Sequence, residues 1–270
     1  MSAREHFLSG RLGDAIADAE GEVRQKPGDA GRRSFLAALL CFAGDLDRAD
    51  RQLEAAGQQL GPREAVGISL LRHLIRAEKA RREFLEKGRL PEFLAEPSED
   101  LRLRLQASIA IREGKPAEAV SILEKAEELR PHSRGTADGA PFDDLRDLDD
   151  LMASFLEVLT ANGKYYWIPF ERVESAQFHP SADPMDLLWR RTLLSVRGGP
   201  DGEVYIPVLY PASHRSADDK VRLGRVTQWQ GGDGSPVSGL GQRVLLAGEK
   251  DMAILDLKSI EITGPVQGGA

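Results

Sequence analysis

The fold is decided by a stretch that reads YYWIPF at residues 165–170, DLLWRR at 186–191 and YIPVLYP at 205–211. This stretch holds all four tyrosines of the chain and two of its three tryptophans. Large aromatic side chains supply much of the burial energy of a small core, and they are also enriched at binding surfaces. The stretch therefore predicts the core of a domain, a recognition surface, or both.

Two antiparallel hairpins are predicted, one that includes the last aromatic segment and one that follows it. Residues 191–196 and 203–210 are rich in β-branched and aromatic side chains and flank a glycine-rich turn. Residues 242–247 and 252–257 form a second pair of the same kind around the turn sequence GEKD. The second half of the chain is thus expected to be rich in β-strands.

Two segments before the aromatic stretch carry different signals. Residues 145–162 follow a run of aspartates and place apolar side chains at helical spacing. Acidic residues in a first turn complement the helix dipole, so the run predicts the start of a helix rather than a metal site. The preceding residues 132–143 are polar and rich in turn-forming residues, which indicates a linker.

The first half, residues 1–131, has apolar residues at helical spacing and breaks at regular intervals. The pattern Gly-x-Leu-x-x-Ala begins at Gly10 and returns at Gly44, 34 residues later, and a related unit begins at Gly114. A helix–turn–helix period of this length resembles the tetratricopeptide repeat, in which antiparallel helix pairs stack on one another. The period fails before Gly114, where residues 64–87 predict one long helix.

Stacked helical repeats commonly bind a peptide or a helix along a concave face. In the repeat register, small and apolar side chains suited to holding a helix would line this face: Ser34, Ala38, Cys41, Leu101, Arg104, Ser108 and Ile111. The alternative is that these residues pack against the next helix or against the second domain.

These patterns predict an α+β protein in three parts. A tetratricopeptide-like helical-repeat domain is expected at residues 1–131, a linker at 132–143, and a small antiparallel β-rich domain at 144–270.

Composition excludes several classes of protein. Lys and Arg number 36 against 43 Asp and Glu, and neither half has a surplus of basic residues, so nucleic acid and anionic membranes are not expected partners. No apolar run approaches the roughly 20 residues that span a bilayer, and the first residues lack the apolar core of a secretory signal. The single cysteine, Cys41, excludes an internal disulfide, so a cytoplasmic protein is expected.

No constellation of reactive residues stands out. Ser181 and His179 lie near two aspartates, but a catalytic triad is a spatial arrangement, and Ser181 lacks the Gly-x-Ser-x-Gly turn of a nucleophile. The five histidines lack metal-binding spacing, and no cofactor is expected. The alternative to a binding protein is an enzyme or small-ligand binder with an aromatic pocket, which would be lined by Trp167, Trp189, Tyr205 and Tyr210.

Five segments follow one another in the second half: GKYYWIPF (163–170), DLLW (186–189), YIPVLY (205–210), LGR (223–225) with Trp229, and GQRVLL (241–246). In order and spacing they resemble the ImpE/TagJ family, accessory proteins of bacterial type VI secretion systems. The resemblance implies a cytoplasmic, non-enzymatic adaptor that binds an N-terminal helix of the small contractile-sheath subunit. Through that subunit it would be linked to the AAA+ ATPase that disassembles the sheath. The sequence leaves a homo-oligomer open.

Overall fold

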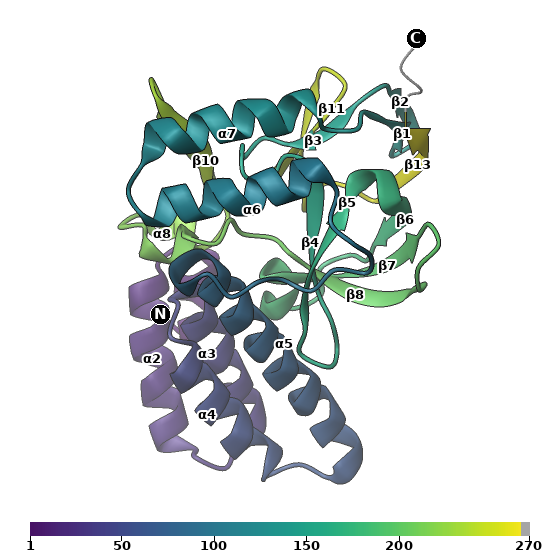
Figure 1. Cartoon of the computed structure of the whole chain (residues 1–270). Helices are drawn as coiled ribbons and strands as arrows, with labels where there is room; N and C mark the ends of the chain where they lie inside the picture. Colours follow the sequence, from purple (N-terminus) through teal and green to yellow (C-terminus); the bar gives the residue numbers. More distant parts are fainter. Residues whose placement is uncertain (266–270) are drawn as a thin grey trace.

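The computed structural model describes residues 1–265 and divides them between helices and antiparallel strands (Figure 1). Helices fill the first half: α1 (Ala3–Leu8), α2 (Leu12–Gln25), α3 (Ala30–Phe42), α4 (Leu46–Gly57), α5 (Pro62–Lys87), α6 (Glu99–Arg112) and α7 (Pro116–Glu128). Strands fill the second half: β1 (Ser133–Ala137), β2 (Ala140–Phe142), β3 (Leu145–Asp147), β4 (Phe155–Leu159), β5 (Tyr165–Pro169), β6 (Val173–Phe178), β7 (Trp189–Val196), β8 (Gly202–Pro207), β9 (Thr227–Gly232), β10 (Ser235–Gly241), β11 (Val244–Ala247), β12 (Lys250–Ala253) and β13 (Ser259–Pro265). The prediction of a helical first half and an antiparallel β-rich second half is confirmed.

The largest sheet has the strand order β2-β1-β13-β6-β7-β8-β4-β5, and two smaller sheets pair β9 with β10 and β3, β11 with β12. Both predicted hairpins are present, as the antiparallel pairs β7–β8 and β11–β12. Since β8 lies between β7 and β4, the third aromatic segment begins in an interior strand. Its side chains are buried from Tyr205 to Pro207.

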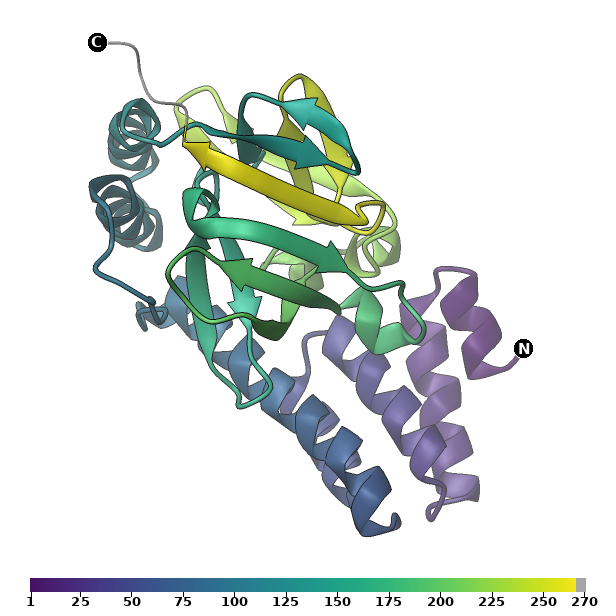
Figure 2. The same cartoon turned by 90° about the vertical axis from the view of Figure 1, so that its right-hand side faces the viewer.

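The helices lie on two sides of the β-rich half (Figures 1 and 2). Helices α1 to α4 form two antiparallel hairpins, and α5 runs from them toward the β4–β5 strands. The α6–α7 hairpin lies on another side, where α7 packs on β10. One continuous hydrophobic core includes side chains of both halves.

The repeated glycines end helices as the sequence indicates. Gly10, Gly44 and Gly114 follow α1, α3 and α6 with φ angles of 78°, 84° and 69°, a left-handed conformation that glycine adopts without a steric cost. The predicted long helix is α5, which spans 26 residues.

The prediction of a helix over residues 145–162 is wrong. This segment forms β3, a turn and β4. The Asp147 and Asp149 carboxylates accept hydrogen bonds from backbone N–H groups two residues ahead, at 2.9 and 3.0 Å, and such bonds compete with helix formation. All five residues of β4 are buried, so the strand has no polar–apolar alternation by which to recognise it.

The prediction that residues 132–143 form a linker is also wrong. The segment expected to be a linker forms β1 and β2, and β1 pairs with β13 inside the large sheet. Turn-forming residues occur there because a tight turn joins the two strands at Asp138 and Gly139, both with positive φ.

The segment from Pro211 to Arg225 fixes the helical hairpins to the β-rich half. The Asp219 carboxylate accepts from the backbone N–H of Leu12 at 2.7 Å, at the start of α2. Arg225 Nη2 donates to the carbonyl of Phe7 at 2.6 Å, at the end of α1. At the next hairpin, His214 lies against Gly44, where an added Cβ would be 2.5 Å from the imidazole ring.

We expect Gly44→Ala to destabilise the protein more than Gly114→Ala. Both glycines have positive φ, which costs an alanine about 1–2 kcal/mol. Only Gly44 would place the new methyl group against His214, whereas nothing lies within 4 Å at Gly114. Overpacking adds roughly 1–3 kcal/mol. Thermal unfolding of the two variants measures the difference, and equal melting temperatures would contradict this packing.

Candidate functional site

Five of the seven residues expected to bind a partner are buried within the chain itself. On α3, Ala38 and Cys41 are each 2% exposed, and Cys41 faces Leu188 and Trp189 of the second half. Burial raises the pKa of the Cys41 thiol well above its usual range, so the thiol stays protonated. Ser34 is half-buried. At Cys41 the concave face of the hairpins is therefore covered by the chain's own β-rich half.

The residues on α6 lie in a different part of the molecule, well apart from α3 in Figure 2. Leu101, Arg104 and Ser108 are buried, and Arg104 donates to the Glu127 carboxylate at 3.1 Å. Ile111 is 39% exposed. The two groups do not form one surface, and Ile111 remains the most accessible member.

The aromatic residues are packed in a core and do not surround one shared pocket. Trp167 is 1% exposed and stacks on Phe155 with ring centroids 3.9 Å apart. Trp189, Tyr205 and Tyr210 are also buried. The cavity beside Trp189 and Tyr210 has a volume of about 20 Å³, close to that of one water molecule. Trp167 borders a separate cleft of about 200 Å³ with Phe93 and Val196. The four aromatic side chains therefore do not line one common pocket in the described residues.

A buried charge network joins α5 to the β-rich half. Arg81 of α5 donates to both carboxylate oxygens of Glu157 on β4, at 3.0 and 2.6 Å. Arg243 forms a second ion pair with Glu157 and donates to Asp147 at 2.8 Å. All four side chains are at most 2% exposed. Three segments far apart in the sequence are thus held together by charge-assisted hydrogen bonds.

The network sets the ionisation of Glu157. Burial alone would raise the pKa of this carboxyl, but Arg81 and Arg243 outweigh burial and lower the pKa to about 2. The folded-state pKa lies below the ordinary value of 4.5, so the stabilisation is present above that pH and is lost as the pH falls toward 2. At neutral pH the carboxylate is charged and both guanidiniums have a counter-charge.

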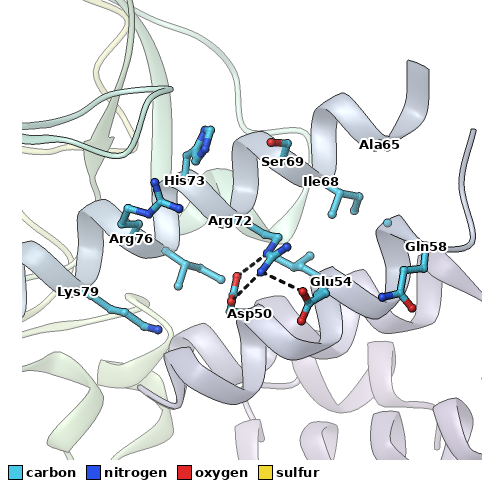
Figure 3. Close-up of a pocket in the computed structure, with 13 residues that line it drawn as sticks. Asp50, Glu54, Gln58, Ala65, Ile68, Ser69, Arg72, His73, Arg76 and Lys79 are labelled. Atoms are coloured by element: carbon cyan, nitrogen blue, oxygen red, sulfur yellow. Dashed lines mark hydrogen bonds and ion pairs between the residues drawn. The ribbon is translucent and has the colours of Figure 1, made fainter. Parts of the chain in front are cut away.

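An open groove lies between α4 and the first half of α5 (Figure 3). Its volume is about 520 Å³. One wall is a single face of α4, with residues at helical spacing: Asp50, Leu53, Glu54, Gly57 and Gln58. The other wall is a face of α5, which includes Ala65, Ile68, Ser69, Arg72, His73, Arg76 and Lys79. From Ala65 to Lys79 the wall is about 21 Å long at about 1.5 Å per residue.

The groove exists because α5 is long. Its second half is buried against the β-rich half through Leu74, Ala77, Arg81 and Phe84. Its first half extends beside α4 and meets the β-rich half at the β4–β5 turn, where His73 Nδ1 lies 2.8 Å from the Ala161 carbonyl oxygen. Val66, earlier in α5, is 68% exposed. The groove was not identified in the sequence, although the failure of the 34-residue period at α5 marks its position.

Charged residues are concentrated at one end of the groove. Arg72 donates to the Asp50 carboxylate at 2.7 and 3.1 Å and lies 3.6 Å from Glu54 (Figure 3). The hydrogen bond from Arg72 lowers the pKa of Asp50. The other end, between Gly57 and Ile68, is uncharged and closely packed. The groove thus has a charged end and an uncharged end, and Gly57 and Ala65 at the uncharged end are half-buried.

A second, smaller cleft of about 250 Å³ lies where α5, α6 and β10 meet. It is lined mainly by apolar side chains, including Ile111, Leu85 and Leu240. Its walls are short segments and a hairpin rather than two long helix faces.

The described residues contain neither a cluster of metal-ligating side chains nor a membrane-spanning helix. Within residues 1–265, no three His, Cys, Asp or Glu side chains lie close enough together to hold a metal ion. None of the described helices is long and apolar enough to cross a membrane.

Fold and site define an α+β protein in which helical hairpins are locked onto an antiparallel sheet and carry an open groove. A family model described as "ImpE protein" matches residues 139–261. The chain is 32% identical to the "Type VI secretion system accessory component TagJ" of Pseudomonas aeruginosa, over 97% of this chain and 91% of that protein. It belongs to the ImpE/TagJ family, as the five sequence segments predicted.

A solved structure has the same fold over almost the whole chain. The crystal structure of protein VPA1032 from Vibrio parahaemolyticus superimposes with a TM-score of 0.89 at 27% identity, and the match covers 96% of this chain and 97% of that one. The arrangement of the two halves is therefore shared with a relative.

We expect Glu157→Gln to lower the free energy of unfolding by about 3–5 kcal/mol at pH 7, because it leaves Arg81 and Arg243 buried with one counter-charge fewer. Glu174→Gln is the matched control, since Glu174 is exposed and lies 3.9 Å from Arg197. Exposed pairs contribute about 0–1 kcal/mol. Urea unfolding measures both. Similar losses in the two variants would show that the buried network is not a main determinant of stability.

Proposed function

We propose that this chain is a non-enzymatic accessory protein of a bacterial type VI secretion system that binds a helix of a partner protein in the α4–α5 groove. The accessory role is supported by its membership of the ImpE/TagJ family and by the name of its Pseudomonas relative. The groove between α4 and α5 is the observation that carries the binding site.

The partner in this proposal is the N-terminal helix of the small contractile-sheath subunit, as the family resemblance implies. A wall about 21 Å long fits about four turns of helix. An amphipathic helix binds by inserting apolar residues spaced i, i+3, i+4 and i+7 into such a groove. The half-buried Gly57 and Ala65, beside the buried Ile68, supply the uncharged surface of the groove.

The α4–α5 groove is preferred over the second cleft because of its shape. The cleft at Ile111 can accept one or two apolar side chains, whereas two parallel walls are needed along the length of a helix. The concave-face residues on α3 are not included in the proposed site, because the chain's own β-rich half covers them.

The proposal has three further parts, which concern the helical repeats, the rigidity of the protein and its role in the cell. The repeated hairpins at Gly10 and Gly44 are tetratricopeptide-like units, and the two halves act as one rigid adaptor in the cytoplasm. By binding the sheath subunit, the adaptor is linked to the ATPase that disassembles the contracted sheath. The supporting observation for rigidity is the set of buried contacts between α5 and β4.

The test is binding of the synthetic N-terminal helix of the cognate small sheath subunit, measured by calorimetry. Ser69 is exposed and lines the groove, so Ser69→Trp should block it and weaken binding at least tenfold, about 1.4 kcal/mol. Ser121→Trp is the matched control, since Ser121 is an exposed helix residue on α7. We expect it to bind as the unmodified protein does.

Two results would contradict the proposal. Lack of binding by the unmodified protein at high micromolar peptide would remove the sheath helix as the partner. Equal binding by the Ser69→Trp and Ser121→Trp variants would place the helix on another surface.

A further inference from the structure

Some of the cations along the groove form ion pairs with acidic side chains, and one does not. Arg72, Arg76 and Lys79 follow one another at intervals of four and three residues on one face of α5. Like charges at this spacing repel and destabilise a helix by a few tenths of a kcal/mol per pair unless counter-charges are near. Helix α4 supplies counter-charges to two of the three.

The two matched cations are those that face acids on α4. Arg72 pairs with Asp50 and Glu54, and Lys79 Nζ lies 2.6 Å from the Asp47 carboxylate. Arg76 is exposed, and no carboxylate of residues 1–265 lies within 4 Å of its guanidinium. Figure 3 shows Arg76 on the α5 wall next to His73. The stem of Arg76 passes the β4–β5 turn, where a Cβ added to Gly163 would lie 3.2 Å from Arg76 Cδ.

The apolar part of the groove lies at a fixed distance from this cation. Gly57 approaches Ile68 so closely that an added Cβ would lie 3.4 Å from the isoleucine methyl group. Arg76 follows Ile68 by eight residues, which is about 12 Å, or about two turns of helix. A helix lying along the groove would meet an apolar region and then, about two turns later, an unmatched positive charge.

We propose that the α4–α5 groove selects a partner helix that carries a carboxylate about two turns from its apolar anchor, and that Arg76 binds this carboxylate. The inference rests on the proposed function and specifies the chemistry of the helix. A guanidinium and a carboxylate can form two parallel hydrogen bonds, which fixes the register of the helix as well as adding affinity. The contribution is partly screened by salt, because the site is open to solvent.

The experiment compares Arg76→Glu with Arg63→Glu. Arg63 is an exposed residue in the first turn of α5, outside the groove lining, so it is the same charge reversal on the same helix. Binding of the fluorescently labelled sheath-subunit peptide is measured by anisotropy at about 50 mM and 500 mM salt. Arg76→Glu should weaken binding about tenfold at low salt and less at high salt, whereas Arg63→Glu should change it less than twofold.

Peptide variants identify the acid. Each Asp or Glu of the peptide is changed to Lys in turn, and one of these peptides should bind the Arg76→Glu variant more tightly than the unmodified peptide does. Equal binding by the two protein variants, or the absence of any such restoring peptide, would overturn the inference. If Ser69→Trp blocks binding while Arg76→Glu does not, the groove is retained as the site and the selection of a carboxylate is rejected.

Discussion

The interaction on which the rest of the structure depends is the buried ion pair between Arg81 and Glu157. Removing such charges from water costs several kcal/mol per ion, and this cost is offset only when good geometry and further hydrogen bonds are present together. Glu157 has both, because Arg243 and Tyr165 also donate to it. The network is therefore stable only when α5, β4 and Arg243, the residue before β11, are assembled together. This requirement couples the folding of the two halves.

This coupling determines which surfaces are left open. With α5 held on β4, the segment from Pro211 to Arg225 reaches the hairpin turns at Gly10 and Gly44, and the concave face closes over Cys41. The half of α5 before Leu74 extends beyond most of the β-rich half and lies beside α4, with the β4–β5 turn reaching it at His73. The open groove is thus a consequence of where the network anchors the long helix.

The sequence predicted the parts of the fold that local patterns define. Glycines at Gly10 and Gly44 mark turns that need positive φ, and the glycine-rich turn between residues 191–196 and 203–210 marks the β7–β8 hairpin. The prediction failed at residues 145–162, because all of β4 is buried, Glu157 included, and the strand lacks the polar–apolar alternation of a half-buried strand. The concave-face residues were predicted to bind a partner helix, with packing against the second domain as the alternative. Local sequence does not reveal that Trp189, about 150 residues away, lies beside Cys41. The groove could not be foreseen either, because its walls depend on where the β-rich half ends along α5.

The central claim is that the β-rich half occupies the concave face and leaves the α4–α5 groove for the partner. Hydrogen–deuterium exchange of the full chain with and without the sheath-subunit peptide tests it most directly. Amides in the exposed first half of α5 should exchange readily in the free protein, and the bound peptide should slow exchange over residues 46–57 and 62–79. Slowed exchange confined to Pro211–Arg215 and β10, at the smaller cleft, with α4 and α5 unchanged, would contradict the account.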